Sequence, residues 1–127
     1  MEVYLDNAAT TRVCPEAAEA ACKAMTEEYG NPGSTHAKGR AARAVLDAAR
    51  KKTAALMGCA DREIVFTSGG TESDNWAVRG AAALQSRKGK HIISSAAEHD
   101  AVRRPLEQLQ KEGFEVTFLP PGPEGGR

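Results

Sequence analysis

The residues at positions 68–73 have the composition of a phosphate-binding turn. They read Ser-Gly-Gly-Thr-Glu-Ser and follow a short run of β-forming residues. Glycine lets a backbone approach a bulky anion closely, and the start of a helix offers unpaired N–H groups and the positive end of its dipole. Thr71 and Ser73 add hydroxyl donors, so this turn can bind a phosphate group.

The same turn has other interpretations. It is not a P-loop, since no Gly-Lys-Ser/Thr follows, and its glycine spacing differs from the dinucleotide fingerprint. An ordinary strand-to-helix turn, in which Thr71 or Ser73 caps the helix, has the same composition. Glu72 is a poor neighbour for a dianion, and we interpret it as a structural carboxylate at the helix start.

His99 is the second candidate for chemistry. It stands in Ala-Glu-His-Asp, directly after another β-rich run. A neutral imidazole at the end of a strand can stack on a ligand ring and exchange protons near neutral pH. A helix cap or a surface histidine is the alternative. For His36, beside a loop, we expect a surface position, and for His91, at the start of a β-rich run, a structural role.

Periodicity and turn residues predict the elements that position these side chains. Helices are expected over residues 15–28, 36–57, 71–84 and 100–112, and strands over 63–67, 91–95 and 114–119. Gly58 is expected to end the long helix, because glycine is common just after the last helical turn. Trp76 is the one large apolar side chain of the third helix and is expected to anchor it by packing. Pro105 is expected to begin or interrupt the fourth helix.

The second half of the chain alternates strand, helix, strand, helix, strand. This order predicts an α/β domain with parallel strands joined by right-handed crossovers. Ligands of such folds bind at the carboxyl ends of the strands. Residues 68–73 and 97–99 both follow strands, so we expect them to lie at that edge.

The charge of the chain is balanced, with 17 basic and 17 acidic residues. A balanced charge gives no basic face, so neither nucleic acid nor an anionic membrane is an expected partner. The apolar stretches are too short to span a bilayer, and the opening Met-Glu-Val-Tyr-Leu-Asp-Asn does not resemble a signal peptide. We therefore expect a cytoplasmic location.

Size and cysteine content limit how the chain can be stabilised. At 13.5 kDa, a compact fold would expose about 6,500 Å² and bury about two-thirds of the surface of the unfolded chain. Cys14, Cys22 and Cys59 are an odd number at wide spacing, which disfavours a disulfide scaffold and a structural zinc site. We interpret them as half-buried thiols of a reducing compartment, and expect no metal site.

Four segments together resemble one family. They read Tyr-Leu-Asp-Asn-Ala-Ala-Thr-Thr at 4–11, Tyr-Gly-Asn-Pro-Gly-Ser-Thr-His at 29–36, Glu-Ile-Val-Phe-Thr-Ser-Gly-Gly-Thr-Glu-Ser-Asp-Asn at 63–75 and His-Ile-Ile-Ser-Ser-Ala-Ala-Glu-His-Asp-Ala-Val at 91–102. In order and spacing they are similar to the pyridoxal-phosphate-dependent cysteine desulfurases of the NifS/IscS type, in aminotransferase class V. The Asn-Ala-Ala-Thr-Thr opening and the Gly-Asn-Pro loop resemble this branch more than the SufS branch.

The resemblance implies a reaction and a site. Pyridoxal phosphate would be bound to a lysine, and L-cysteine would become L-alanine while a cysteine thiolate takes the sulfur as a persulfide. In this picture Gly70 and Thr71 hold the cofactor phosphate, and His99 stacks on the pyridine ring and relays protons. The sulfur would pass to an iron–sulfur scaffold or another acceptor protein, and the enzyme would be a homodimer.

The 127 residues lack parts that the resemblance requires. They contain no Ser-x-His-Lys segment to carry the lysine, no matching aspartate for the pyridine nitrogen and no persulfide cysteine, since Cys14, Cys22 and Cys59 match none of the family's contexts. We therefore expect an incomplete N-terminal portion that is inactive without the missing C-terminal portion. The alternatives are another class V enzyme, such as a selenocysteine lyase or an aminotransferase, and a non-catalytic truncated remnant.

The resemblance also implies a fold. Residues 1–14 would be the N-terminal segment of a small domain, and residues 15–127 the truncated N-terminal part of the large, pyridoxal-phosphate-binding domain of fold type I. That part would have three strands with flanking helices in an incomplete sheet. In the family's sheet four later strands separate the strand at 63–67 from the other two, so it has no native neighbour here and the sheet has an unpaired edge.

Overall fold

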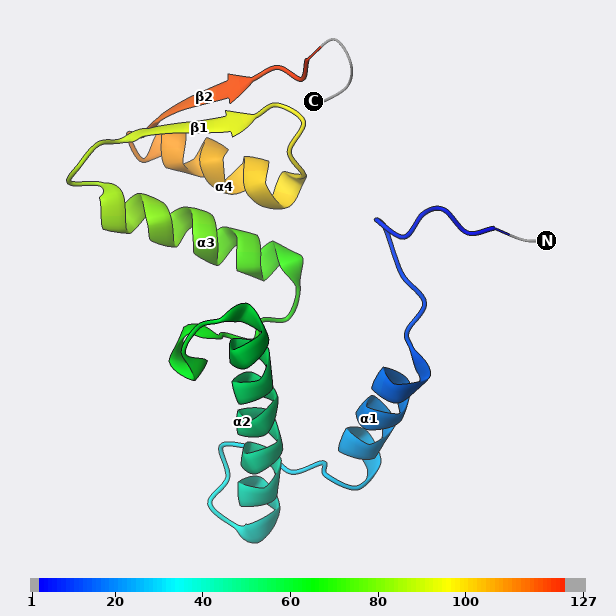
Figure 1. The fold of residues 1–127 in the computed structure, drawn as a ribbon. Coiled ribbons are helices and arrows are strands. Elements are labelled where there is room, and N and C mark those ends of the chain that lie inside the picture. The colour runs from blue at the N-terminus through cyan, green and yellow to red at the C-terminus, as the bar shows by residue number, and fades with distance from the viewer. Residues whose placement is uncertain (1–2, 123–127) are drawn as a thin grey trace. The chain divides into compact units, whose positions relative to one another are not determined.

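The computed structural model describes residues 3–122 and has the expected α/β architecture. The chain divides into two compact units, Met1–Val65 and Phe66–Arg127. Within the described residues the first unit is helical, and the second contains a small two-stranded sheet with helices (Figure 1). The assignment of residues 1–14 to a small domain and 15–127 to a large one stays a prediction.

The first unit contains two helices and a short 3-10 turn. Helix α1 spans Pro15–Thr26 and α2 spans Ala37–Met57, followed by the 3-10 turn η1 at Asp61–Glu63. Pro15 stands in the first turn of α1, where its missing N–H costs nothing. The helix ends two residues before the predicted position 28.

Both ends of α2 are stabilised by specific local contacts. At the start, Nδ1 of His36 accepts a hydrogen bond from the backbone N–H of Gly39 at 3.3 Å. At the end, Gly58 takes the left-handed conformation, with φ of 67°, as the sequence predicts for this stop. Gly39 also fits closely under the preceding loop, because a Cβ at this position would overlap the carbonyl oxygen of Ser34.

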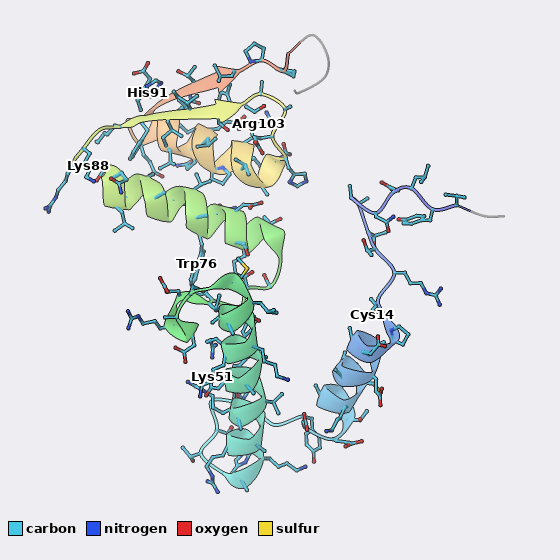
Figure 2. All side chains as sticks on the ribbon, viewed as in Figure 1. Cys14, Lys51, Trp76, Lys88, His91 and Arg103 are labelled. Carbon is cyan, nitrogen blue, oxygen red and sulfur yellow. The ribbon has the colours of Figure 1, made fainter. Side chains whose placement is uncertain are left out.

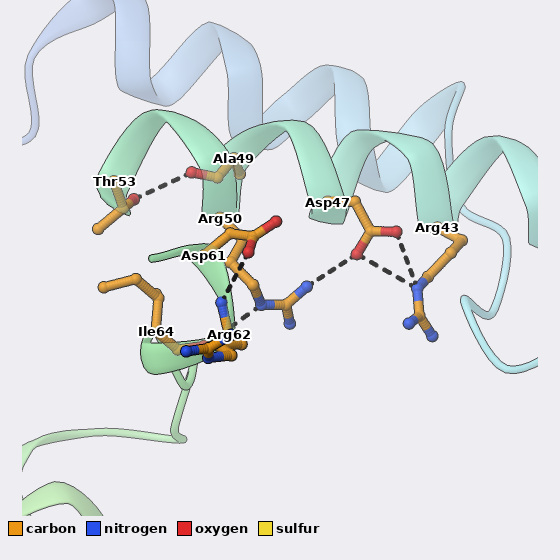
Figure 3. A network of polar contacts seen from close by, with 8 residues as sticks. All are labelled: Arg43, Asp47, Ala49, Arg50, Thr53, Asp61, Arg62 and Ile64. Carbon is orange, nitrogen blue, oxygen red and sulfur yellow. Dashed lines mark hydrogen bonds and ion pairs between the residues drawn. The ribbon is translucent and has the colours of Figure 1, made fainter. Parts of the chain in front are cut away.

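A polar network attaches residue 64 to α2 (Figure 3). The Asp47 carboxylate accepts from Nε of Arg43 at 3.1 Å and from the guanidinium of Arg50 at 2.8 Å. Arg50 Nε then donates to the carbonyl of Ile64 at 3.3 Å. The carbonyl that a strand would offer to a neighbour is therefore bonded to a side chain.

The prediction of a strand at 63–67 is wrong for this structure, which has two strands among its described residues and not three. Glu63 belongs to η1, and Ile64 is extended, with φ of −93° and ψ of 121°, but pairs with no strand. Extended backbone becomes a strand only when a neighbour satisfies its N–H and C=O groups. In the family that this chain resembles, residues 63–67 would pair with later strands that are not among these 127 residues. Without those strands, residues 63–67 have no neighbouring strand to pair with among the described residues and do not form a strand.

The second unit forms a strand–helix–strand unit preceded by one helix. Helix α3 spans Gly70–Gln85, strand β1 His91–Ser95, helix α4 Asp100–Lys111 and strand β2 Glu115–Leu119. The strands are parallel, with Ile92 opposite Val116 and Ser94 opposite Phe118. The predicted parallel alternation is confirmed from α3 onward.

The core of this unit lies between the sheet, α4 and α3 (Figure 1). Leu106 and Leu109 of α4 are 2% and 3% exposed, and they form a cluster with Ala82 of α3. Partly buried side chains of both strands pack against this cluster: Ile92, Val116 and Phe118. Helix α4 therefore joins the sheet to α3.

Helix α4 begins at Asp100 and continues through Pro105, so the prediction that this proline begins or interrupts the helix is wrong. Proline cannot donate to the carbonyl four residues earlier, which here is that of Ala101. Pro105 is buried in the α4 face that carries Leu106 and Leu109, and this packing offsets the lost helical hydrogen bond.

Much apolar surface stays exposed. Among the described residues the buried apolar side chains are those of Leu106, Leu109, one proline and four alanines, which is a small core for a chain of 13.5 kDa. Ile93 and Leu119 stand exposed on the sheet face opposite the core, although parallel sheets are normally covered on both faces. Trp76, the predicted anchor of α3, is 59% exposed. No helix in the described part of the chain is long and apolar enough to cross a membrane.

We predict that Leu106→Ala lowers the free energy of unfolding by about 2–5 kcal/mol, because it leaves a cavity between α4, the sheet and α3. Urea unfolding followed by far-UV circular dichroism measures this change. The control is Leu84→Ala on the exposed side of α3, expected to change stability by less than about 0.5 kcal/mol. Equal effects of the two substitutions would contradict the assigned core.

We also predict opposite effects for one substitution at two helical glycines. Gly39→Ala lowers the free energy of unfolding by about 1–3 kcal/mol, because the new methyl group overlaps the Ser34 carbonyl. Gly80→Ala raises it by up to about 1 kcal/mol, because no atom lies within 4 Å of its added Cβ and alanine favours the helix. The same urea titration measures both, and a stabilising Gly39→Ala would contradict the close loop contact.

Candidate functional site

The turn before α3 is held by the carboxylate of Glu72. Its Oε2 accepts from the backbone N–H of Ser68 at 2.7 Å and from the Ser68 hydroxyl at 2.8 Å. These two hydrogen bonds, the backbone one first, hold the pKa of the Glu72 carboxyl below its ordinary value. The interpretation of Glu72 as a structural carboxylate agrees with this contact, which turns its charge back toward Ser68.

The hydroxyl of Ser73 is also engaged within the turn. Its Oγ lies 2.7 Å from Oγ1 of Thr67 and 3.3 Å from the carbonyl of Gly69, which also accepts from the Ser73 N–H. The N-cap residue of α3 is Gly69, which has no side chain to close the helix end. The alternative in which Thr71 or Ser73 caps the helix is therefore not what the structure has.

Four donors at the start of α3 have no acceptor among the described residues. They are the backbone N–H groups of Gly70, Thr71 and Glu72 and the hydroxyl of Thr71. A Cβ built on Gly69 or Gly70 would meet no atom within 4 Å, so this backbone is open to a bulky group. Free N–H groups at a helix start, together with a free hydroxyl, suit an anion such as a phosphate.

His99 is the N-cap of α4. Its Nδ1 accepts from the backbone N–H of Ala101 at 3.1 Å, so the helix-cap alternative is what the structure has. This contact does not use the ring faces or Nε2, and the side chain is exposed. While Nδ1 accepts, a neutral ring carries its proton on Nε2, which can then donate to a ligand. Capping and ring stacking are therefore compatible.

Thr71 and His99 line the same cavity, which lies between α3 and α4 and has a volume of about 440 Å³. This volume is within the roughly 300–1,000 Å³ of small-molecule sites. Arg79 and Arg104 also line it. Two of the predicted site residues, 28 positions apart in sequence, thus meet at one place, and the third, Gly70, precedes Thr71 in the chain.

The arginines of this cavity have acidic partners. The hydrogen bond from Arg103, which does not line the cavity, at 2.7 Å, and then that from Arg104 at 3.0 Å, hold the pKa of the Asp100 carboxyl below its ordinary value. Arg79 pairs with Glu112 at 3.1 Å. All of these pairs are exposed, so they orient the guanidinium groups more than they stabilise the fold.

The other sequence candidates are not among the residues that line this cavity. His91 stands on the sheet face opposite α4 (Figure 2), with Nε2 2.8 Å from the hydroxyl of Thr117, consistent with a structural role. Cys14, Cys22 and Cys59 are free and exposed, so their predicted half-burial is wrong. The described residues contain no group of three or more side chains able to hold a metal ion.

Asn75 is a site residue that sequence reasoning did not single out. From the second turn of α3, its Nδ2 donates to the carbonyl of Thr71 at 2.9 Å and lies 3.5 Å from the carbonyl of Ala101 in α4. It also lines the cavity of Thr71 and His99. One feature of the sequence pointed to such a contact. Pro105 has no N–H to donate to the carbonyl of Ala101, four residues earlier, so this carbonyl needs another donor.

Comparison with known proteins identifies similar sequences and similar solved structures. The chain is 51% identical over 118 residues to the cysteine desulfurase IscS of Methanosarcina thermophila, covering 93% of this chain and 29% of that protein. A solved NifS-like protein superposes with a TM-score of 0.84 at 39% identity, over 95% of this chain and 33% of that one. A structure described as SspA in complex with cysteine has a TM-score of 0.78 at 33% identity, over 90% and 33% of the two chains.

The chain therefore spans about a third of the length of the relatives it matches. This agrees with the prediction that it corresponds to a portion of such a protein. The family match itself extends over residues 3–127 and includes the turn at 68–73, His99 and Asn75. The chain belongs to the aminotransferase class V family.

Proposed function

We propose that this chain supplies the cofactor-phosphate and ring-stacking part of a pyridoxal-phosphate-dependent cysteine desulfurase. The complete enzyme would convert L-cysteine to L-alanine and pass the sulfur to a cysteine thiolate as a persulfide. The observation that carries the proposal is the cavity that is lined both by Thr71, whose N–H and hydroxyl have no acceptor among the described residues, and by His99. About 50% identity to a protein named cysteine desulfurase supports the choice of reaction.

The residues present fit the phosphate of this cofactor. A phosphate needs several converging donors and an open backbone, and the start of α3 has three N–H groups and a hydroxyl without acceptors among the described residues. Glu72 does not oppose the dianion as strongly as its position suggests, because its carboxylate is bonded to Ser68. In this proposal Gly70 donates its N–H, and Thr71 donates both its N–H and its hydroxyl.

His99 would orient the cofactor ring and hold a proton near it. Its Nδ1 is fixed by Ala101 N–H, so the ring plane is set by the start of α4 and does not turn freely. A face of the imidazole then stacks on the pyridine ring, and Nε2–H offers a proton to the substrate side. The bound cofactor supplies an electron sink for the substrate's bonding electrons.

The remaining roles belong to residues outside these 127. The lysine, the aspartate partner of the pyridine nitrogen and the sulfur-accepting cysteine have no match in this chain. We propose that they come from a C-terminal portion, and that the complete enzyme is a cytoplasmic homodimer whose acceptor is an iron–sulfur scaffold or another sulfur-accepting protein. Similarity to a protein described in complex with cysteine supports the choice of cysteine as the substrate.

We predict that Thr71→Ala raises the dissociation constant of pyridoxal phosphate in the complete enzyme about tenfold to a hundredfold, because one hydrogen bond to a dianion is lost. Equilibrium dialysis of the cofactor-free protein measures this constant. Thr71→Ser keeps the hydroxyl and is expected to retain most of the affinity. Equal affinity of wild type and Thr71→Ala would contradict the phosphate assignment.

Two substitutions of His99 separate its two roles. His99→Asn keeps an N-cap acceptor and loses the ring, so it is expected to preserve the thermal stability and to weaken cofactor binding about tenfold. His99→Phe keeps a ring and loses the cap, so it is expected to lower stability by about 1 kcal/mol and to bind the cofactor more tightly than His99→Asn. Calorimetry and dialysis measure the two quantities. The same cofactor affinity in both variants would contradict stacking.

A further inference from the structure

The carbonyl of Ala101 lacks its normal helical donor. It lies in the first turn of α4, and the residue four positions later is Pro105, which has no N–H. Ala101 is only 6% exposed, so water does not readily replace the missing donor. A buried carbonyl without a partner is destabilising, and the fold must find a donor outside α4.

Asn75 of α3 supplies that donor. Its Nδ2 lies 3.5 Å from the Ala101 carbonyl and 2.9 Å from the carbonyl of Thr71. Both partners are carbonyls and the amide nitrogen carries two hydrogens, so one side chain can serve both. Asn75 is half-buried and lines the cavity; its contact with the Ala101 carbonyl is partly buried, and its contact with the Thr71 carbonyl is exposed.

These contacts connect the two halves of the candidate site. On one side, Asn75 binds the carbonyl of Thr71, whose hydroxyl is the free donor at the start of α3. On the other side, it reaches Ala101, whose N–H is the group that His99 caps. A single amide therefore lies between the residue that would bind the phosphate and the residue that orients the imidazole.

We propose that Asn75 is a positioning residue that sets the distance between the phosphate donors at Thr71 and the ring of His99. This inference rests on the proposed function, because the distance between Thr71 and His99 matters only if one cofactor binds both residues. The short methylene and ester linkage of pyridoxal phosphate limits the separation between its phosphate and its ring, so a rigid connection between α3 and α4 avoids an ordering cost on binding. Asn75 makes this connection through the one carbonyl in α4 that Pro105 leaves without a donor.

The test measures cofactor affinity and stability separately in the complete enzyme. Asn75→Ala and the isosteric Asn75→Asp, whose carboxylate faces two carbonyls, are each expected to raise the dissociation constant of pyridoxal phosphate about tenfold. Both should also lower the melting temperature. Gln110→Ala removes an exposed amide from α4, away from the cavity, and serves as the matched control with unchanged affinity.

The double variant Asn75→Ala/Pro105→Ala distinguishes positioning from a merely structural role. Alanine at position 105 restores an N–H to the Ala101 carbonyl, so the melting temperature should recover relative to Asn75→Ala. The connection to Thr71 stays broken, so the cofactor affinity should stay about tenfold weakened. Recovery of affinity together with stability would overturn the proposal, because satisfying the carbonyl would then be the whole role of Asn75.

Parallel variants separate failure of this inference from failure of the proposed function. If Thr71→Ala and His99→Asn weaken cofactor binding while Asn75→Ala does not, the positioning role is overturned and the proposed function stands. If Thr71→Ala and His99→Asn both bind pyridoxal phosphate like the wild type, the proposed function fails and the positioning role fails with it.

Discussion

The parallel pairing of β1 with β2 is the constraint on which the second unit depends. Two parallel strands cannot be joined by a tight turn, so the chain must return through a crossover, which here is α4. That helix starts just beyond the carboxyl end of β1, and its first turn is capped by His99. Leu106 and Leu109 then fix the helix against the sheet and α3. The place of the imidazole therefore follows from the pairing of two strands.

The chemistry of the turn before α3 depends on which polar groups are already engaged. Glu72 binds Ser68, and Ser73 binds Thr67 and Gly69, so their charge and hydroxyl groups are directed into the turn. Because the N-cap Gly69 has no side chain, the first N–H groups of the helix lack a protein acceptor among the described residues. The turn is thus held by its own hydrogen bonds while these N–H groups have no protein acceptor among the described residues. The turn at residues 68–73 can therefore be stable by its own hydrogen bonds and still bind an anion through its N–H groups.

Local sequence patterns predicted what depends on local physics. The strands at 91–95 and 114–119, the helix stop at Gly58 and the turn at 68–73 follow from β-propensity, glycine conformation and turn chemistry. The strand at 63–67 did not form because pairing is a non-local property, and the structure offers it no neighbour. Exposure of Trp76 has the same origin, since burial depends on what packs against a helix and not on its own periodicity. Pro105 shows in the sequence that the Ala101 carbonyl needs a donor, but not that Asn75, 26 residues away in another helix, supplies it.

In the proposed function, Gly70, Thr71 and His99 form one half of a pyridoxal phosphate site. A crystal structure of the complete polypeptide with the cofactor tests this most directly. We expect phosphate oxygens within hydrogen-bond distance of the Thr71 hydroxyl and the Gly70 and Thr71 N–H groups, with the pyridine ring stacked on His99 while His99 still caps α4. A cofactor whose phosphate is held by other residues, with Thr71 and His99 both out of contact, would contradict it.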